Sequence, residues 1–291
     1  MLKYGIIIHK PALTFIDQLE LLKSRGLIVE NDANAIQVLN RVNYYKLSGY
    51  SLSMRINDKF VPMTTFNQIY RLYLFNKEFS LALFDLIESI EGTIKTQIAY
   101  YMAHQYGATG YLNAEHFRNA NWHLNFMDLC ERSIERNKRL GYVQHNLNTY
   151  GSLPVWVMLE ILSFGEVSKL YGNMILKDQR CIAKGVFGVA PNKLKNWLEV
   201  ITIIRNRCAH HGRLYNTYLS IPLNLYRDMR SQGVNSKSYY ALLIIMKKLV
   251  LKEAQWSRFV DSLERLLINY ADVLELNRLG FKGKWRDVLS L

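Results

Sequence analysis

The sequence predicts an all-α fold, and three observations support that prediction. Only 5 of the 291 residues are prolines, which break the interior of a helix, so most of the chain is able to form helices. Apolar residues recur at spacings of three and four over most of the length, which is the period of an amphipathic helix. Strand signals are few. With 49% hydrophobic residues, the chain can bury the core of one large domain or of two closely associated ones.

The strongest strand signal lies between Tyr50 and Val61. There Asn57-Asp58, a turn-like pair, separates two short mixed runs that we expect to form one small β-hairpin. We therefore expect an N-terminal helical extension with this hairpin over residues 1–62. A helical body follows over residues 63–291, because no Gly-, Pro- or Ser-rich linker marks a sharper boundary.

The first long helix of the body begins at a recognisable N-cap. Thr65 followed by Gln68 is a capping box, in which each side chain bonds the backbone N–H of the other residue. Apolar residues continue at core spacing to about Tyr106, where Gly107 ends the pattern. The spacing predicts one helix over this whole segment.

Two further helix starts lie in the second half of the chain. Ser163 and Glu166 form a second capping box. Pro191 stands where the first turn of a helix tolerates proline, ahead of Trp197. We expect this helix to pack through Trp197 against Trp156 of an earlier helix.

Composition limits the classes of function. Lysine and arginine number 37 against 24 acidic residues, a formal net charge of +13, which suits a phosphate-bearing partner such as RNA. A basic surface with no partner explains the charge equally well. The longest apolar run, Tyr239 to Met246, is far shorter than the roughly 20 residues that cross a bilayer. With no signal peptide at Met1, we expect a cytoplasmic protein with no membrane partner.

The cysteines indicate neither a disulfide framework nor a metal site. Cys130, Cys181 and Cys208 are odd in number and form no C-x-x-C pair. Cys208, His210 and His211 are metal-ligand types, but neighbours in sequence rarely converge on one ion. We therefore expect no metal and no other cofactor.

The run from Arg205 to His211 contains the residue types for metal-independent RNA cleavage. That reaction needs a base for the 2′-hydroxyl proton, an acid for the departing 5′-oxygen and a cation for the developing negative charge. Histidine titrates near neutrality and suits the first two roles, and an arginine fork suits the third. We assign phosphate binding to Arg205 and the base or acid role to His210, with Asn206 and His211 assisting.

Helix geometry constrains this site. Five positions place Arg205 and His210 about 140° apart around an ideal helix, whereas Asn206 and His210 share a face. Either the helix ends within the motif, where Gly212 suits the positive-φ position beyond it, or a second copy completes the site. We favour a symmetric homodimer. Spacing alone favours a simpler reading, in which Arg205 and His210 only cap a helix C-terminus.

Resemblance to known families favours the catalytic role of Arg205 and His210 over the capping role. Arg205-Asn206-x-x-x-His210 resembles the signature of the HEPN superfamily (higher eukaryotes and prokaryotes nucleotide-binding). Nearly the whole chain is similar to the Abi family of abortive-infection proteins, of the AbiD and AbiF kind. The similar segments, in order, are Lys10-Pro11, Gln18, Arg25-Gly26-Leu27, Asn43 to Tyr50, Leu72 to Phe75, Ile87 to Glu91, Leu153 to Trp156, Glu160, Leu162 to Gly165 and Arg205 to Asn216. Asn76-Lys77 and Lys95 depart mildly from the family pattern.

The resemblance implies a helical HEPN-type bundle, endoribonuclease activity at Arg205 and His210, a homodimer and a role in phage defence. It also implies a toxin-like protein that a small structured RNA restrains. The competing hypothesis is a non-catalytic RNA-binding or protein-interaction module that uses the same basic site. A third reading makes Tyr215 a modification site, although a packing tyrosine explains that residue as well.

Two other groups of residues have a functional reading and a purely structural one. Glu88 and Glu91, three residues apart in an apolar helix, could face inward and touch Arg205, which makes Glu91 a supporting residue of the site. A partly exposed face, with Lys95 one turn after Glu91, is the alternative. Tyr44, Tyr45 and Tyr50 could stack on unpaired bases, but core packing is the more ordinary role of such rings.

Overall fold

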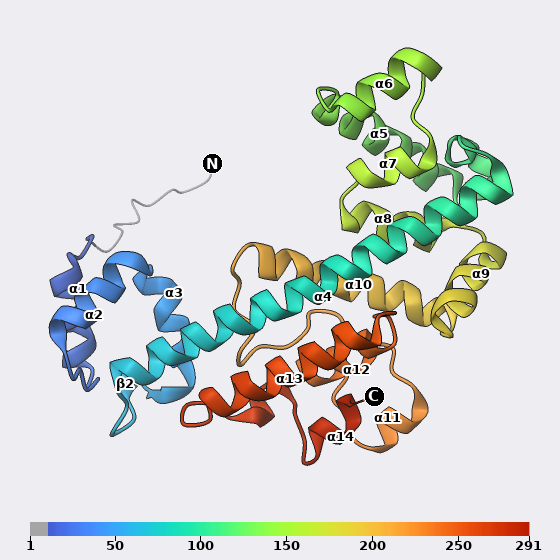
Figure 1. Cartoon of the computed structure of the whole chain (residues 1–291). Helices are drawn as coiled ribbons and strands as arrows, with labels where there is room; N and C mark the ends of the chain where they lie inside the picture. The colour runs from blue at the N-terminus through green and yellow to red at the C-terminus, as the bar shows by residue number, and fades with distance from the viewer. Residues whose placement is uncertain (1–10, 291) are drawn as a thin grey trace, which may run out of the picture. The chain divides into compact units, whose positions relative to one another are not determined.

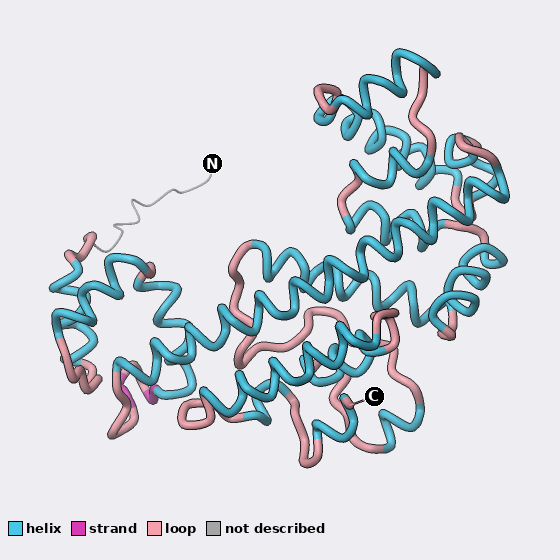
Figure 2. Tube along the Cα trace, in the orientation of Figure 1, coloured by secondary structure: helices cyan, strands magenta, loops and turns pink. Residues whose placement is uncertain are grey.

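The computed structural model describes residues 11–290. Within this range nearly every element is helical, and the only strands form one two-stranded hairpin (Figures 1 and 2). The prediction of an all-α fold with one small β-hairpin is confirmed. The chain divides into two compact units, residues 1–78 with 267–274, and residues 79–266 with 275–291. Each unit is described by itself.

The first unit consists of short helices and the hairpin. Its elements are α1 (Phe15–Ser24), α2 (Asp32–Arg41), α3 (Tyr44–Ser48), η1 (Gly49–Met54), β1 (Arg55–Ile56), β2 (Lys59–Phe60) and the start of α4 (Phe66–Tyr106). In the hairpin Arg55 pairs with Phe60 and Ile56 with Lys59. Asn57 and Asp58 both have positive φ, 49° and 67°, as the two central residues of a type I′ turn require.

The N-cap of α4 is the predicted capping box. The Thr65 N–H donates to Gln68 Oε1 at 3.0 Å, and the Gln68 N–H donates to Thr65 Oγ1 at 3.2 Å. Gly107 follows the helix with φ +80°, a conformation that glycine adopts without a steric penalty. The predicted helix from Thr65 to about Tyr106 is confirmed.

The second unit contains the rest of α4 and most of the later helices. These are α5 (Ala120–Asn137), α6 (Gly141–Tyr150), α7 (Val155–Ile161), α8 (Phe164–Asn173), α9 (Leu176–Phe187), α10 (Pro191–Ala209), α11 (Arg227–Ser231), α12 (Tyr239–Lys247), α13 (Glu253–Asn269, whose last residues belong to the first unit) and α14 (Trp285–Leu289). Short 3-10 turns lie at η2 (Gly110–Leu112), η3 (Ala114–His116) and η4 (Leu276–Leu279).

The core of the second unit forms around α4, α10 and α12. The α4 side chains that are fully buried there recur at helical spacing: Phe79, Leu83, Leu86, Ile87, Ile90, Ile94 and Ile98. All residues from Tyr239 to Met246 in α12 are buried, so this apolar run is an internal helix of the core. None of the helices in the described range is both long and apolar enough to span a membrane.

Helix α8 packs closely against α10. Its predicted capping box, Ser163 with Glu166, is present. A Cβ on Gly165 would lie 3.3 Å from Thr202 Cγ2, and one on Gly172 would lie 3.2 Å from Lys195 Cε. These two glycines therefore allow the close approach of α8 to α10.

The expected packing of Trp156 against Trp197 is wrong. Trp197 is fully buried and donates from Nε1 to the Asn224 carbonyl at 3.2 Å, but Trp156 is 50% exposed. Helix α7 turns Val155, Met158 and Leu159 into the core instead. Because these three residues form the buried face of α7, Trp156 lies on its exposed face.

Candidate functional site

Arg205 lies on α10 and is held against α4 within the second unit. Its Nε is 3.7 Å from Glu91 Oε2, and its guanidinium carbon lies 5.6 Å from the centre of the Phe84 ring. Figure 1 shows the ribbons of α4 and α10, the two helices that these contacts join. Phe84 and Glu91 are seven residues apart, two turns along one face of α4. The Arg205 side chain remains 37% exposed, so part of it is available to a ligand.

Glu91 holds a second cation. Its other carboxylate oxygen, Oε1, forms an ion pair with Lys95 Nζ at 3.1 Å, and the side chains of Glu91 and Lys95 are largely buried, 15% and 11% exposed. Lys95 Nζ also donates to the Glu160 carbonyl at 3.5 Å. Glu88, by contrast, is exposed and lines a different surface depression with Lys252 and Arg258. Of the two glutamates, only Glu91 lies beside Arg205.

The helix that carries the motif ends inside it. α10 ends at Ala209 and His210 is the C-cap residue, with φ −94° and ψ 15°. The Gly212 N–H donates to the Arg207 carbonyl at 2.7 Å, and the His211 N–H donates to the Cys208 carbonyl at 3.0 Å. These two bonds are the Schellman pattern that satisfies terminal carbonyls of a helix. His210 therefore begins a loop, and the angle of 140° computed for a continuous helix does not describe it.

The positive-φ residue of this turn is His211, not Gly212. His211 has φ +54°, so the assignment of that conformation to Gly212 is wrong. Gly212 is required for a different reason: a Cβ there would lie 2.6 Å from Arg207 Cγ and 3.1 Å from the Arg207 carbonyl oxygen. The close return of the chain onto α10 leaves no room for a side chain at Gly212.

We expect the free energy of unfolding of His211→Gly to exceed that of His211→Ala by about 1 kcal/mol, because glycine adopts the left-handed conformation without the penalty of a Cβ. The measurement is urea unfolding of the two variants and the parent, followed by circular dichroism. Gly151 at the C-cap of α6 already has the left-handed conformation. As a control, Gly151→Ala should lower the free energy of unfolding of the protein by a similar amount. Equal stability of the two His211 variants would contradict the assignment.

Asn206, His210 and His211 are all exposed at the end of α10. Within residues 11–290, none of the three side chains has a hydrogen-bonding partner. A catalytic histidine ordinarily needs such a partner to fix its orientation and its tautomer. The described residues of one chain therefore provide no hydrogen bond that would orient these three side chains.

Arg207, which sequence reasoning did not single out, has a structural role. Its Nη1 donates to the Tyr239 hydroxyl of α12 at 2.8 Å and lies 3.4 Å from the Tyr218 carbonyl. The Tyr239 hydroxyl is in turn 3.0 Å from Thr217 Oγ1. Arg207 thus ties the end of α10 to α12 and to the loop after the motif. No local pattern in the sequence indicated these partners.

Cys208 and Tyr215 are buried, 5% and 2% exposed. Burial raises the pKa of the Cys208 thiol to about 11, so near pH 7 it is a neutral packing group. The Tyr215 hydroxyl accepts the Glu275 N–H at 3.0 Å. A buried tyrosine with an occupied hydroxyl packs in the core, and the reading of Tyr215 as a modification site is not supported. Residues 11–290 contain no cluster of three potential metal ligands.

The tyrosines of the N-terminal region divide between the two roles considered. In the first unit Tyr50 is 3% exposed and makes an edge contact with Tyr73, with ring centres 5.8 Å apart. Tyr45 is 86% exposed. Tyr50 is therefore a core residue, and only Tyr45 is fully accessible to a partner.

Comparison with known families identifies the class of protein. A model of the family described as Abi-like protein matches residues 37–216, more than half of the chain and including the whole Arg205–His211 run. The chain belongs to this family, which implies a role in abortive infection, a form of phage defence. No curated protein and no solved structure gave a match.

Proposed function

We propose that this protein is a metal-independent endoribonuclease of an abortive-infection system, with the fold and chemistry of the HEPN superfamily. The observation that carries the proposal is the placement of Arg205 and His210. Arg205 lies against α4, with its Nε at ion-pair distance from Glu91 and its guanidinium over the Phe84 ring, and part of its side chain is exposed; His210 is exposed at the end of the same helix. We assign the activity to the helical body from residue 63 onward, with residues 1–62 as an N-terminal extension.

In this proposal Arg205 binds the scissile phosphate through its guanidinium fork and stabilises the charge that develops in the transition state. His210 takes the proton of the 2′-hydroxyl or gives a proton to the leaving 5′-oxygen. Asn206, one turn before His210, is placed to orient the phosphate, and His211 supplies a further exposed imidazole. The net charge of +13 favours binding of the RNA backbone.

We further propose that the site is composite and forms in a homodimer. Within the described residues His210 has no side chain that orients it, and a second copy would supply one. A two-fold axis near the ends of the two α10 helices would bring both copies of His210 to one phosphate, one as base and one as acid. The same proposal places the protein in the cytoplasm, where its RNA substrate and a restraining small RNA would be found.

The test is cleavage of single-stranded RNA by the purified protein in excess EDTA. We expect products with 2′,3′-cyclic phosphate and 5′-hydroxyl ends, since the 2′-oxygen is the nucleophile. The same RNA with 2′-O-methyl groups must stay intact. Salt-sensitive RNA binding without product at any protein concentration would instead support the non-catalytic binding module.

A further inference from the structure

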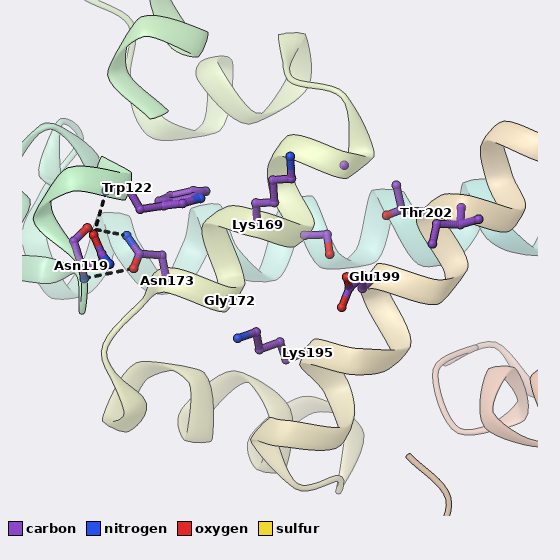
Figure 3. Close-up of a pocket in the computed structure, with 11 residues that line it drawn as sticks. Asn119, Trp122, Lys169, Gly172, Asn173, Lys195, Glu199 and Thr202 are labelled. Carbon is purple, nitrogen blue, oxygen red and sulfur yellow. Dashed lines mark hydrogen bonds between the residues drawn. The ribbon is translucent and has the colours of Figure 1, made fainter. Parts of the chain in front are cut away.

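A pocket of about 550 Å³ lies on the second unit between α5, α8 and α10. Among the residues that line it are an aromatic ring and four charged or polar side chains, labelled in Figure 3: Trp122, Lys169, Lys195, Glu199 and Thr202. Neither Arg205 nor His210 lines it, so it is separate from the candidate cleavage site. Its volume is that of a typical site for a small molecule or for one unit of a polymer.

The pocket contains two lysine side chains that form no ion pair with a carboxylate in the described part of the chain. Lys169 comes from α8 and Lys195 from α10, and both are exposed. In the described part of the chain, neither ammonium group lies within 4.0 Å of a carboxylate. Gly172 lies under the Lys195 side chain, 3.2 Å from its Cε if a Cβ were present. Two unpaired ammonium groups at one pocket favour an anionic ligand such as a phosphate.

An aromatic ring forms another wall. The Trp122 ring stacks on Phe126 with centres 5.5 Å apart and planes at 11°, and its backbone N–H donates to Asn119 Oδ1 at 2.9 Å. Asn119 is itself fixed to α8, because its N–H donates to Asn173 Oδ1 at 3.1 Å and its carbonyl accepts from Asn173 Nδ2 at 3.2 Å. Trp122 is partly exposed and held in place, as a stacking platform for a nucleobase must be.

The remaining polar groups suit the edge of a base. Glu199 is exposed in the pocket, one turn after Lys195 on α10. A carboxylate accepts hydrogen bonds but donates none, so it favours a base with an exocyclic amino group. Thr202 Oγ1 is buried and has no hydrogen-bonding partner within residues 11–290. A polar ligand in the pocket would satisfy it.

The pocket shares a face of α10 with the candidate cleavage site. Lys195, Glu199, Thr202 and Asn206 recur along α10 at spacings of four, three and four, and His210 is the C-cap residue of the same helix. At 1.5 Å per residue, the pocket residues of α10 lie roughly 12 to 22 Å along the helix axis from His210. A single strand of several nucleotides spans that length.

We propose that this pocket binds one nucleotide of the RNA strand at a distance of a few nucleotides from the scissile phosphate. Trp122 stacks on the base, Lys169 and Lys195 bind the adjoining phosphates, and Glu199 accepts from the amino group of adenine, cytosine or guanine. The inference rests on the proposed ribonuclease function and specifies how its substrate is held. A free mononucleotide has the same chemistry; the line of residues leading to Asn206 favours the strand.

The test measures binding of a fluorescein-labelled 2′-O-methyl oligoribonucleotide of mixed sequence by anisotropy, because this probe cannot be cleaved. We expect Trp122→Ala to raise Kd about 10-fold or more, and Trp122→Phe, which keeps a stacking ring, to stay near the parent. Lys169→Ala and Lys195→Ala should each lower the slope of log Kd against log salt concentration by about 0.7. Parental Kd and slope in all of these variants would overturn the proposal.

Matched controls come from the same unit. Trp156→Ala removes a tryptophan that is 50% exposed on α7, and Lys177→Ala removes an exposed lysine of α9. Neither residue lines the pocket, so Trp156→Ala should leave Kd unchanged, and Lys177→Ala should change neither Kd nor the slope by as much as the pocket variants. Thermal unfolding of each variant separates loss of the fold from loss of the site.

Two further measurements, competition by adenosine monophosphate and RNA cleavage, distinguish the pocket's role from the ribonuclease function. Adenosine monophosphate that binds in a Trp122-dependent manner without competing with the oligonucleotide would show a mononucleotide site and overturn the strand proposal. RNA cleavage with unchanged KM in the pocket variants would overturn the pocket while the ribonuclease function stands. Pocket-dependent RNA binding by a parent protein that never cleaves would refute the ribonuclease function and leave the pocket's RNA-binding role intact.

Discussion

His210→Ala should lower the rate of RNA cleavage by about 10²- to 10⁴-fold, the range expected when a general acid or base is removed. Arg205→Ala should lower it by about 10²- to 10³-fold, because a preorganised positive group is lost at the developing charge. His210 is exposed at the C-cap of α10, and its side chain makes no hydrogen bond within residues 11–290, so the fold should survive. Single-turnover cleavage assays with equal protein concentrations measure both effects.

Two residues of the same types serve as controls. His145 on α6 and Arg180 on α9 are exposed and lie outside the motif, so His145→Ala and Arg180→Ala should cleave at nearly the parental rate. If His210→Ala or Arg205→Ala cleaves as fast as the parent, the ribonuclease site assigned here is wrong. Arg207→Ala is no substitute for Arg205→Ala, because the Arg207 guanidinium bonds the Tyr239 hydroxyl of the core.

Mixing the two inactive variants tests whether the site is composite. If Arg205 of one copy acts with His210 of the other, a mixed dimer has one site with both residues intact. Random re-association makes half of the dimers mixed, so the mixture should regain roughly a quarter of the parental activity. A mixture as inactive as either variant alone would exclude this pairing of one Arg205 with one His210, and it is the result expected if the site needs both copies of His210.

Glu91→Gln should reduce both stability and activity. The Glu91 carboxylate faces Lys95 at 3.1 Å and Arg205 at 3.7 Å, and the side chains of Glu91 and Lys95 are only 15% and 11% exposed. Removing its charge leaves the Lys95 ammonium in a nearly buried position without a counter-ion. After a discount for partial exposure, we expect a loss of about 2 kcal/mol in the free energy of unfolding. Glu88→Gln, on an exposed turn of the same helix, should change it by less than about 0.5 kcal/mol.

The double variant Glu91→Gln with Lys95→Met distinguishes a structural role of Glu91 from positioning of Arg205. Replacing both charges should recover most of the lost stability. If Glu91 also positions Arg205, the cleavage rate at saturating RNA stays about 10- to 100-fold below the parent, as expected for a misplaced catalytic group. Recovery of stability and rate together would mean that Glu91 serves only to neutralise Lys95. Urea unfolding and single-turnover cleavage provide the two readings.

Local sequence patterns predicted the boundaries that depend on neighbouring residues. The capping boxes at Thr65 and Ser163, the hairpin turn at Asn57-Asp58 and the end of α4 at Gly107 all lie where the sequence indicates. In each case the determining hydrogen bond or backbone conformation involves residues within about one turn of each other. Such signals do not depend on the rest of the fold.

Signals from distant residues were missed or misassigned. One local signal was also misplaced by one position: the sequence suggests Gly212 for the positive φ after α10, but His210 is the C-cap and the Schellman turn puts that conformation at His211. The partners of Arg207 on α12 were likewise invisible to any local pattern. Trp156 and Trp197 look alike in sequence, yet only Trp197 is buried, because the packing of α7 leaves one side of that short helix exposed.

The sequence by itself determined the helical class, the caps and the residue types of the Arg205–His211 run, since periodicity, capping and chemistry can be read within a few residues. Only the tertiary structure decided which groups meet. Glu91 and Phe84 reach Arg205 because two helices far apart in the chain lie side by side, and the pocket between α5, α8 and α10 draws each wall from a different helix. A contact between distant residues depends on the packing of the whole unit, which no local pattern encodes.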